Sequence, residues 1–309
     1  MSLYQNLSET TRNDNSIITV GSFDGVHVGH AKILFTLVNR AKERNCRSVL
    51  LTFEPHPRKV VSKDFDLRLL TSTDEKKRLI SRLGVDEILV IPFTKEFSQM
   101  SSDDFFNEFI IKKIGIKEII LGYDHRFGKG RDGDENKVRE LGKLFGFDVT
   151  TVPAVKFGDL TVSSSLIRKE LAEGRVKNIR DYLNRYYSIT GSVSEGDKRG
   201  RLLGFPTANI SVSDSDKMIP SNGVYAVRVI IGDEAFKGVM NIGKRPTFQS
   251  IESTILEVNI FDFEKNIYGR EITVEFIDRL RDEQKFSSKD ELIAQIEKDK
   301  KRALEILTN

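Results

Sequence analysis

The sequence has only one cysteine and four histidines among its 309 residues. A lone cysteine, Cys46, excludes an internal disulfide framework and a zinc site built from several cysteines, and it favours a reducing compartment. No apolar run approaches the roughly 18 residues of a membrane-spanning helix, and the N-terminal MSLYQNLSETTRNDNS lacks the apolar core of a signal peptide. We therefore expect a soluble cytoplasmic protein.

An excess of charge of one sign is also missing. Lys and Arg number 49 against 46 Asp and Glu, which gives a formal net charge of +3. This balance excludes the basic coat of a nucleic-acid-binding protein and the basic face of a protein that binds anionic membranes. Glycine and proline number 22 and 7, too few for a disordered chain. At this length we expect about two folded domains.

The first half of the chain alternates apolar strand-like runs with segments of helical periodicity. Strands are predicted over residues 17–20, 47–53, 87–93, 117–122 and 148–155, and helices over 30–45, 72–84, 103–114 and 134–145. Ser72 and Glu75 match a capping box at the start of the second helix. Strands that alternate with helices predict an open, mostly parallel α/β sheet with right-handed crossovers.

From about residue 185 the pattern changes. Strand-like runs follow one another, split by Gly, Asn and Asp turns, and only residues 287–307 have a helical period. A run of strands after a run of alternating units predicts a second domain, a small antiparallel barrel with a terminal helix. A helix over 168–185 links the two, so the expected domains are 1–185 and 186–309.

Two of the four histidines, His27 and His30, lie in the decapeptide GSFDGVHVGH, directly after a predicted strand. They could be a metal pair, a packed pair that satisfies the turn, or donors for a phosphate. A spacing of three where a helix only begins fits poorly with the i, i+4 pattern of zinc ligands. A glycine turn before a helix presents backbone N–H groups and the positive end of the helix dipole to an anion. The setting therefore favours phosphate, as in a nucleoside triphosphate site.

GSFDGVHVGH resembles the HxGH signature of nucleotidyltransferases, and most closely that of the FAD synthetase module in bacterial bifunctional riboflavin kinase/FAD synthetases. Three further segments resemble other sequence motifs of the same module. TFEPHPRKV (52–60) is similar to its second signature, LGYDHRFGKGRDGD (121–134) to its loop for flavin and phosphate, and SSSLIR (163–168) to its SSTxIR segment.

The second half carries the rest of the resemblance. KRGRLLGFPTANI (198–210) resembles the riboflavin kinase signature PTAN, and NIGKRPTF (241–248), LEVNIFDFEKNIYG (256–269) and LRDEQKF (280–286) follow in family order. The resemblance implies a Rossmann-like nucleotidyltransferase domain with a parallel sheet, then a riboflavin kinase-like barrel. It implies an enzyme that phosphorylates riboflavin to FMN with ATP, releasing ADP. A second ATP then adenylylates FMN to FAD with release of pyrophosphate.

The resemblance also implies a set of site residues. Glu257 is expected to be the general base of the kinase, and His27, His30 and Arg168 are expected to supply charge during adenylyl transfer. The residues expected to contact ATP and its phosphates are Gly21, Phe23, Asp24, Gly25, Ser164, Gly196, Arg201 and Gly204. Those expected to contact the flavin are Asp124, Arg126, Phe127, Arg281 and Phe286.

A magnesium site is expected in the second domain, to accompany ATP, and no zinc site is expected. Thr207 and Asn209 are two residues apart, so on a strand they share one face and offer a pair of hard oxygen ligands. SSSLIR departs from the family pattern, with Ser165 for Thr and Leu166 where Arg is frequent. The departure weakens any role for position 166.

Two other functions remain open. The chain could be a nucleotidyltransferase for another phosphorylated acceptor, with the barrel as an accessory module. More distantly, it could be a non-enzymatic protein that binds nucleotides or RNA. PTAN and Glu257 argue against the first and the balanced charge against the second. We expect neither nucleic acid nor a membrane as a partner.

Overall fold

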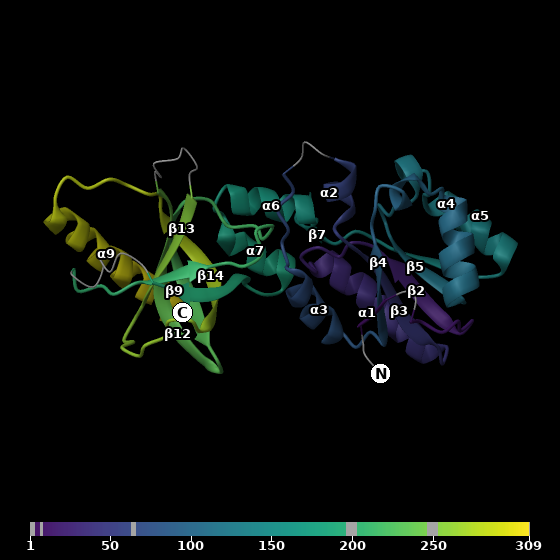
Figure 1. The fold of residues 1–309 in the computed structure, drawn as a ribbon, viewed down its shortest axis with the longest axis horizontal. Helices are drawn as coiled ribbons and strands as arrows, with labels where there is room; N and C mark the ends of the chain where they lie inside the picture. Colours follow the sequence, from purple (N-terminus) through teal and green to yellow (C-terminus); the bar gives the residue numbers. More distant parts are fainter. Residues whose placement is uncertain (1–3, 7–8, 63–65, 196–202, 246–252, 309) are drawn as a thin grey trace. The chain divides into compact units, whose positions relative to one another are not determined.

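The computed structural model describes residues 4–6, 9–62, 66–195, 203–245 and 253–308. Contacts between Cα atoms divide the chain into two compact units, Met1–Ser164 and Ser165–Asn309. The first is an α/β unit and the second is mostly antiparallel strand (Figure 1).

The first unit alternates strands with helices as the apolar pattern predicts. Its strands are β1 (Tyr4–Asn6), β2 (Ser16–Val20), β3 (Arg47–Glu54), β4 (Glu87–Pro92), β5 (Glu118–Gly122), β6 (Asp148–Val152), β7 (Lys156–Phe157) and β8 (Leu160–Thr161). Its helices are α1 (Val28–Glu43), α2 (Pro57–Val61), α3 (Thr73–Ser81), α4 (Ser102–Phe105) and α5 (Glu135–Phe145), with short helical turns η1 (Phe97–Gln99) and η3 (Lys129–Arg131) and the π-helix η2 (Phe106–Ile114).

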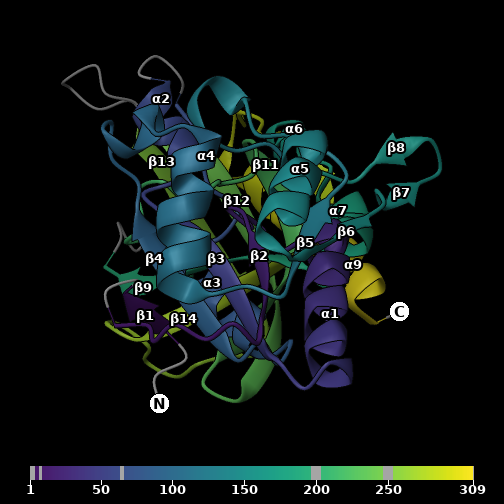
Figure 2. The same cartoon turned by 90° about the vertical axis from the view of Figure 1, so that its right-hand side faces the viewer.

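Six of these strands form one parallel sheet in the order β1-β4-β3-β2-β5-β6. The predicted parallel sheet is confirmed, with β1 as an additional edge strand that the apolar pattern does not predict. β1 has only three residues, too few to show the alternation of apolar and polar side chains from which a strand is predicted. β7 and β8 pair separately as a hairpin that projects from this unit (Figure 2).

Helices cover both faces of the sheet. On one face, Leu34, Leu37 and Val38 of α1 pack with Ile80 of α3 against the strands. On the other face, α4, η2 and α5 pack through a second apolar cluster, in which Phe106 is fully buried. A sheet covered on both sides needs apolar residues at successive positions, which explains the continuous apolar run of β3.

The strand order reverses between β2 and β5. The chain runs from β2 to β3 and β4 in one direction along the sheet, and later from β5 to β6 in the other. Open parallel sheets bind ligands at such a switch point, outside the carboxyl ends of the strands. GSFDGVHVGH forms the loop after β2 and the first residues of α1, and residues 123–134 follow β5. The fold therefore brings two of the predicted motifs to the same edge of the sheet.

The second unit contains a closed antiparallel barrel, which confirms that prediction. Its strands are β9 (Tyr187–Ser194), β10 (Ala208–Ser211), β11 (Gly223–Ile231), β12 (Glu234–Arg245), β13 (Ser253–Ile260) and β14 (Glu271–Arg281), in the order β10-β13-β12-β11-β14-β9. Tyr225 and Phe276 fill its interior with their ring centroids 5.4 Å apart. The terminal helix α9 (Lys289–Thr308) packs Ala303 against β11 and β14.

The predicted linking helix is in fact two helices, α6 (Ser164–Ala172) and α7 (Val176–Leu183). The break contains Gly174, whose φ of 72° is left-handed. α7 packs on β14 and β9, so by contact these helices belong with the barrel.

Candidate functional site

The turn between β2 and α1 has an unusual backbone. Phe23, Gly25 and Val26 all have positive φ values, of 49°, 83° and 39°. Non-glycine residues rarely adopt this region, and such strain concentrates at functional sites. The turn leads into α1, where His27 is the N-terminal capping residue. Residues 21–30, which contain this turn and the start of α1, are called the histidine turn below.

Asp24 holds this turn in place. Its side chain is buried, and its carboxylate accepts hydrogen bonds from the backbone N–H of Leu70 at 3.0 Å and of Thr71 at 3.2 Å. The Thr71 hydroxyl in turn accepts the Gly25 N–H at 3.1 Å, and the Ser164 hydroxyl donates to the Asp24 carbonyl at 2.9 Å. The structure thus gives Asp24 and Ser164 a scaffolding role, and their contact with ATP stays a prediction.

The two histidines are stacked on one another. Their ring centroids are 3.7 Å apart with an angle of 19° between the planes. Nδ1 of His27 accepts the backbone N–H of His30 at 3.3 Å, so His27 is neutral and carries its proton on Nε2. Gly29 makes the arrangement possible, because a Cβ there would lie 3.0 Å from Cε1 of His27.

His30 is held in its neutral form as well. Its Nδ1 atom is buried and has no hydrogen-bond partner in the described ranges. Burial lowers the pKa of His30 well below 6.5, and repulsion from His27, were that ring protonated, and from the Lys76 ammonium lowers it further. That the two imidazoles supply charge to a bound phosphate stays a prediction. No group of three His, Cys, Asp or Glu in the described part of the chain could hold a metal.

Lowering the pH should therefore destabilise the first unit through His30. In the unfolded chain His30 takes up a proton near pH 6.5, whereas in the folded chain it does so only at a lower pH. The free energy of unfolding therefore decreases as the pH falls below 6.5. The loss should be about 1.4 kcal/mol per pH unit until the folded-state pKa is reached. Urea unfolding of the wild type and His30→Gln, followed by circular dichroism at about pH 7.5 and about pH 5.5, measures it. Identical pH dependence in the two proteins would contradict this account.

Gly25 is required by both its backbone angle and its neighbours. Its φ is 83°, and a Cβ there would lie 2.7 Å from Cδ1 of Leu70. Gly25→Ala should lower the free energy of unfolding by about 2–4 kcal/mol, from left-handed strain plus overpacking. Gly84→Ala is the matched control, since Gly84 has a φ of 79° and nothing within 4 Å of its Cβ position. It should cost only about 1–2 kcal/mol. Equal losses in urea unfolding would show that the Leu70 contact is unimportant.

The predicted flavin loop contributes one aromatic ring to a larger cluster. Asp124 and Arg126 are exposed, whereas Phe127 packs with its ring centroid 5.1 Å from that of Phe106. Gly133 pairs with Phe127 through two backbone hydrogen bonds and leaves no room for a side chain beside the ring.

The rest of this cluster was missed by motif analysis. Phenylalanine rings from the ends of β3 and β4 and from η1, α4 and η2 meet edge to face, tilted or stacked, with centroids 5.4–6.0 Å apart. These rings belong to Phe53, Phe93, Phe97, Phe105 and Phe109. The chain has 20 phenylalanines and no tryptophan, so the only available signal was their crowding over residues 93–109.

Arg168 lies on α6 and is partly buried. Contacts assign the chain from Ser165 onward to the second unit. That Arg168 reaches His27 and His30 stays a prediction.

In the barrel, three side chains form a row across neighbouring strands. Asn209 of β10 and Asn241 of β12 both lie opposite Glu257 of β13. Directly opposed residues share a face of the sheet. Leu256 and Val258 are buried and Glu257 between them is partly exposed, so Glu257 lies on the opposite face of β13.

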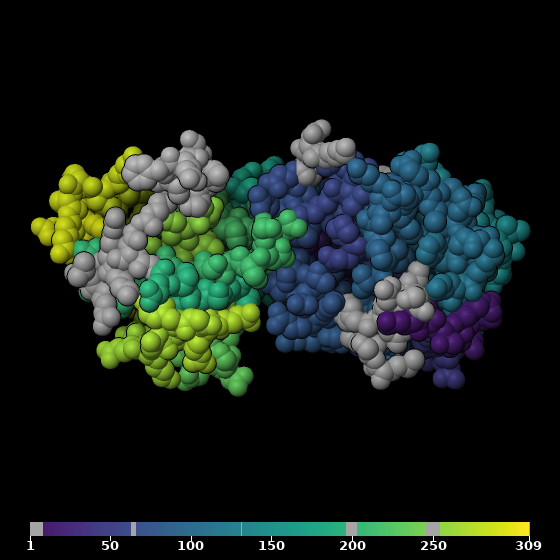
Figure 3. Space-filling model, viewed as in Figure 1, coloured from purple at the N-terminus to yellow at the C-terminus, as the bar shows by residue number. Residues whose placement is uncertain are grey.

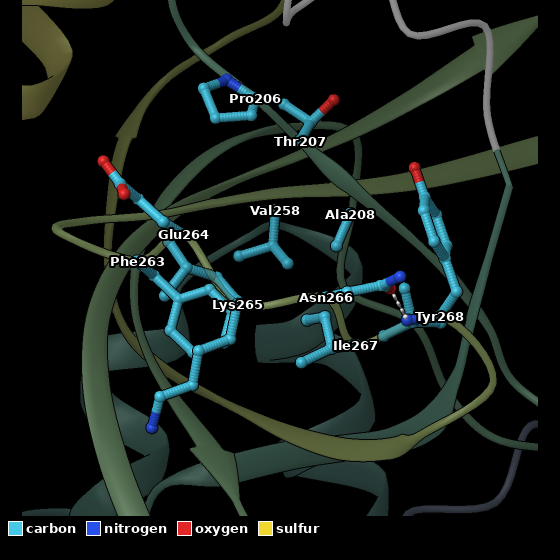
Figure 4. Close-up of a pocket in the computed structure, with 12 residues that line it drawn as sticks. Pro206, Thr207, Ala208, Val258, Phe263, Glu264, Lys265, Asn266, Ile267 and Tyr268 are labelled. Atoms are coloured by element: carbon cyan, nitrogen blue, oxygen red, sulfur yellow. Dashed lines mark hydrogen bonds between the residues drawn. The ribbon is translucent and has the colours of Figure 1, made fainter.

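Thr207 lies two residues before Asn209 and lines a pocket of about 570 Å³. Val193 and Ile260 also line it, together with Pro206, Ala208, Val258 and residues 263–268. The last three of these groups and Thr207 are labelled in Figure 4. Gly269, which directly follows this segment, donates its backbone N–H to the Val193 carbonyl of β9 at 2.9 Å. The surface of this unit is drawn in Figure 3, with the later strands in green to yellow-green. A hydroxyl, an amide oxygen and a carboxylate on one stretch of barrel are hard oxygen ligands, so this donor set fits Mg²⁺.

The remaining predicted residues differ in how far the structure describes them. Arg281 and Phe286 come together, with the guanidinium carbon 5.8 Å from the ring centroid, but Arg281 is also paired with Asp299 of α9 at 2.8 Å. Gly204 is exposed with a φ of 83°. Gly196 and Arg201 lie outside the described residues.

Two family models match the chain and divide it in the same order as the motifs. The model described as FAD synthetase matches residues 9–166, and the model described as riboflavin kinase matches residues 183–307. The bifunctional riboflavin kinase/FMN adenylyltransferase of Escherichia coli K12 is 36% identical over 301 residues, which cover 97% of this chain and 95% of that protein. The chain belongs to the bifunctional riboflavin kinase/FMN adenylyltransferase family.

Other comparisons agree with this family. The Bacillus subtilis protein of the same name is 37% identical over 95% of this chain and 93% of its own length. A crystal structure titled as a macrolide-efflux protein from Streptococcus pneumoniae superposes with a TM-score of 0.88 at 30% identity, covering 97% of this chain and 98% of that one. The described helices include none that is both long and apolar enough to cross a membrane.

Within this member of the family, the two candidate sites fall in different matched regions. The histidine turn and the aromatic cluster lie in the FAD synthetase region, and Thr207, Asn209 and Glu257 lie in the riboflavin kinase region. Arg168 lies between the two matches. The resemblance seen in the motifs is therefore confirmed over both halves of the chain.

Proposed function

We propose that this chain converts riboflavin and ATP to FMN and ADP in its barrel. We further propose that it converts FMN and a second ATP to FAD and pyrophosphate in its parallel-sheet unit. One observation carries the proposal. The structure builds two separate constellations, a neutral histidine pair at a switch point and an Asn–Glu–Asn row beside a pocket, and each lies in the region matched by the corresponding family model.

In the barrel, Glu257 would take the proton from the 5′-hydroxyl of riboflavin as that oxygen attacks the γ-phosphate of ATP. The Thr207 hydroxyl and the Asn209 amide oxygen would hold Mg²⁺, which supplies charge neutralisation for the phosphates when bound. The pocket beside Thr207 would take the nucleoside of ATP. Gly196, Arg201 and Gly204 are proposed to cover the phosphates, and Arg281 with Phe286 to flank the flavin.

In the first unit, a phosphate oxygen of FMN would attack the α-phosphorus of ATP, and the bond to the pyrophosphate oxygen would break. The nucleophile is already an anion, so no base is needed, and catalysis is positioning plus stabilisation of developing charge. His27 and His30 would donate through Nε2–H, together with the N-terminal amides of α1. Gly21 and Phe23 would line the phosphate site and Arg168 would add a cation.

The aromatic cluster around Phe127 would take the flavin of FMN, because ring stacking suits a large planar ligand. Asp124 and Arg126, both exposed on the same loop, would contact its polar edge. We place the functional boundary near residue 185, where the barrel strands begin, and the working compartment in the cytoplasm.

Incubating the protein with riboflavin and Mg-ATP alone tests the proposal. FMN should appear first and FAD second by liquid chromatography. Formation of FAD from added FMN without formation of FMN from riboflavin would instead favour the alternative, a nucleotidyltransferase with an accessory barrel. The riboflavin kinase match over residues 183–307 disfavours that alternative.

A further inference from the structure

A second carboxylate lies close to the Asn–Glu–Asn row of the barrel. Glu283 follows the end of β14, and its Oε2 atom accepts a hydrogen bond at 3.1 Å from the side-chain amide of Asn222, which directly precedes β11. β14 and β11 are paired there, with Arg281 opposite Val224. Oε1 of Glu283 accepts no hydrogen bond from any residue that the structure describes. The carboxylate is therefore held by one oxygen, and the other is available to a ligand.

Gly243 of β12 makes room for this carboxylate. Gly243 is buried, and a Cβ at its position would overlap Oε1 of Glu283 and lie 3.4 Å from Nδ2 of Asn241. Gly243 and Asn241 are two residues apart, so the two positions share a face of β12, and Asn241 lies directly opposite Glu257. The carboxylate of Glu283 therefore occupies the place of the missing side chain, on the same face as the proposed general base.

Glu283 and the pocket lie on opposite sides of Glu257 along β13. The pocket is lined by Val258, which follows Glu257 on the strand. Gly243 instead pairs with Ile255, which precedes Glu257 by two residues, a distance of about 7 Å along a strand. With the nucleoside of ATP in the pocket, the substrate that gives up its hydroxyl proton approaches Glu257 from the side on which Glu283 lies.

The segment that contains Glu283 also carries the pair proposed to flank the flavin ring. Arg281 is fixed by Asp299 of α9, whose Oδ2 atom accepts from Nε and Nη2 of the guanidinium at 2.9 and 2.8 Å. The guanidinium carbon is 5.8 Å from the ring centroid of Phe286. A flavin with its ring at this pair and its 5′-hydroxyl at Glu257 would lead its ribityl chain past Glu283.

We propose that Glu283 binds the secondary hydroxyls of the ribityl chain and so selects a flavin with a polyhydroxyl chain as the substrate of the kinase. A carboxylate can accept hydrogen bonds from neighbouring hydroxyls, and such charge-assisted bonds are stronger than those between neutral groups. Asn222 holds the carboxylate in place, and Gly243 leaves room for it. This role rests on the riboflavin kinase activity proposed above and names the part of riboflavin that the barrel recognises.

The test compares riboflavin with an analogue in which a 5′-hydroxypentyl chain replaces the ribityl chain. The analogue keeps the ring and the primary hydroxyl but has no secondary hydroxyls. Phosphorylation of each flavin by Mg-ATP is followed by liquid chromatography in the wild type, in Glu283→Ala and Glu283→Gln, and in Gly243→Ala, whose Cβ would displace the Glu283 side chain. Gln284→Ala is the matched control, since Gln284 is the next residue and is also exposed.

The wild type should have a higher kcat/KM for riboflavin than for the analogue. Glu283→Ala should lower kcat/KM for riboflavin about 10–100-fold, the range expected for a hydrogen bond to a charged group, and mostly by raising KM for riboflavin. KM for ATP and the rate with the analogue should stay within about twofold of the wild type. Glu283→Gln should lose less, because its amide oxygen still accepts a hydrogen bond. Gly243→Ala should also lose preference for riboflavin, and Gln284→Ala should match the wild type.

Two results would overturn the proposal. One is an equal loss with both flavins, as a glutamate needed only for folding would give, and the other is a Glu283→Ala enzyme that keeps the wild-type preference for riboflavin. If the wild type phosphorylates neither flavin, the proposed kinase activity fails, and binding of the two flavins in the presence of Mg-ADP, measured by quenching of flavin fluorescence, decides the role of Glu283. The wild type should then bind riboflavin more tightly than the analogue, and Glu283→Ala should bind both alike. Any other pattern of binding would contradict the role.

Discussion

Replacing His30 with alanine should lower FAD formation from FMN by about 10²–10³-fold, the usual loss when one preorganised donor to a developing charge is removed. FMN formation from riboflavin should stay at the wild-type rate, because the barrel has its own site. The reason is geometric. His30 is stacked on His27 at 3.7 Å at the start of α1, where we propose that it donates to the phosphate through Nε2–H.

Two further variants and one control test this prediction. His27→Ala should behave like His30→Ala, and Gly29→Ala should give a smaller loss, because its Cβ would displace the His27 ring. Phe35→Ala is the control, since Phe35 is on the same helix and 63% exposed. Both rates are read from one chromatogram with riboflavin or FMN as the starting flavin. A His30→Ala enzyme that loses both activities while still folded would contradict the assignment of separate sites.

Replacing Glu257 with glutamine should give the opposite result. FMN formation should fall by about 10²–10⁴-fold, the range typical for loss of a general base. FAD formation from supplied FMN should be unaffected. Glutamine keeps the shape and the cross-strand pairing with Asn209 and Asn241, so the change removes the proton acceptor alone.

Glu271→Gln is the matched control for this substitution, because Glu271 is an exposed glutamate on β14 of the same barrel. It should leave both rates at the wild-type level. If Glu257→Gln retained most of the kinase rate, another group would have to accept the proton, and the role proposed for the Asn–Glu–Asn row would be wrong.

The parts of the fold that follow from periodicity could be predicted from the sequence. The apolar runs at 17–20 and 47–53 became β2 and β3, and Ser72 caps α3 with Glu75 as expected. The strand β1 and the split of the linking helix could not be predicted in this way. Three polar residues have no period, and a helix break at Gly174 looks the same in sequence as a tolerated glycine.

The site shows the same division. The histidine turn, PTAN and Glu257 could be found from the sequence because each lies within a short contiguous motif. Properties that depend on tertiary burial were not visible: the neutral state of His30, the aromatic cluster and the π-helical winding of Phe106–Ile114. Lys76 is the clearest case, because TDEKKR is typical of a solvated helix start, and only the fold shows that one of its lysines is buried.

A complementation assay tests the central claim, two separate sites in one chain, most directly. His30→Ala and Glu257→Gln are each incubated with riboflavin and Mg-ATP, and then together. His30→Ala alone should accumulate FMN, Glu257→Gln alone should make almost no product, and the mixture should make FAD, as the FMN released by one variant is used by the other. A mixture that stops at FMN, although Glu257→Gln still adenylylates added FMN, would show that the reactions do not proceed through free FMN. FAD formation by His30→Ala alone at the wild-type rate would contradict the account outright.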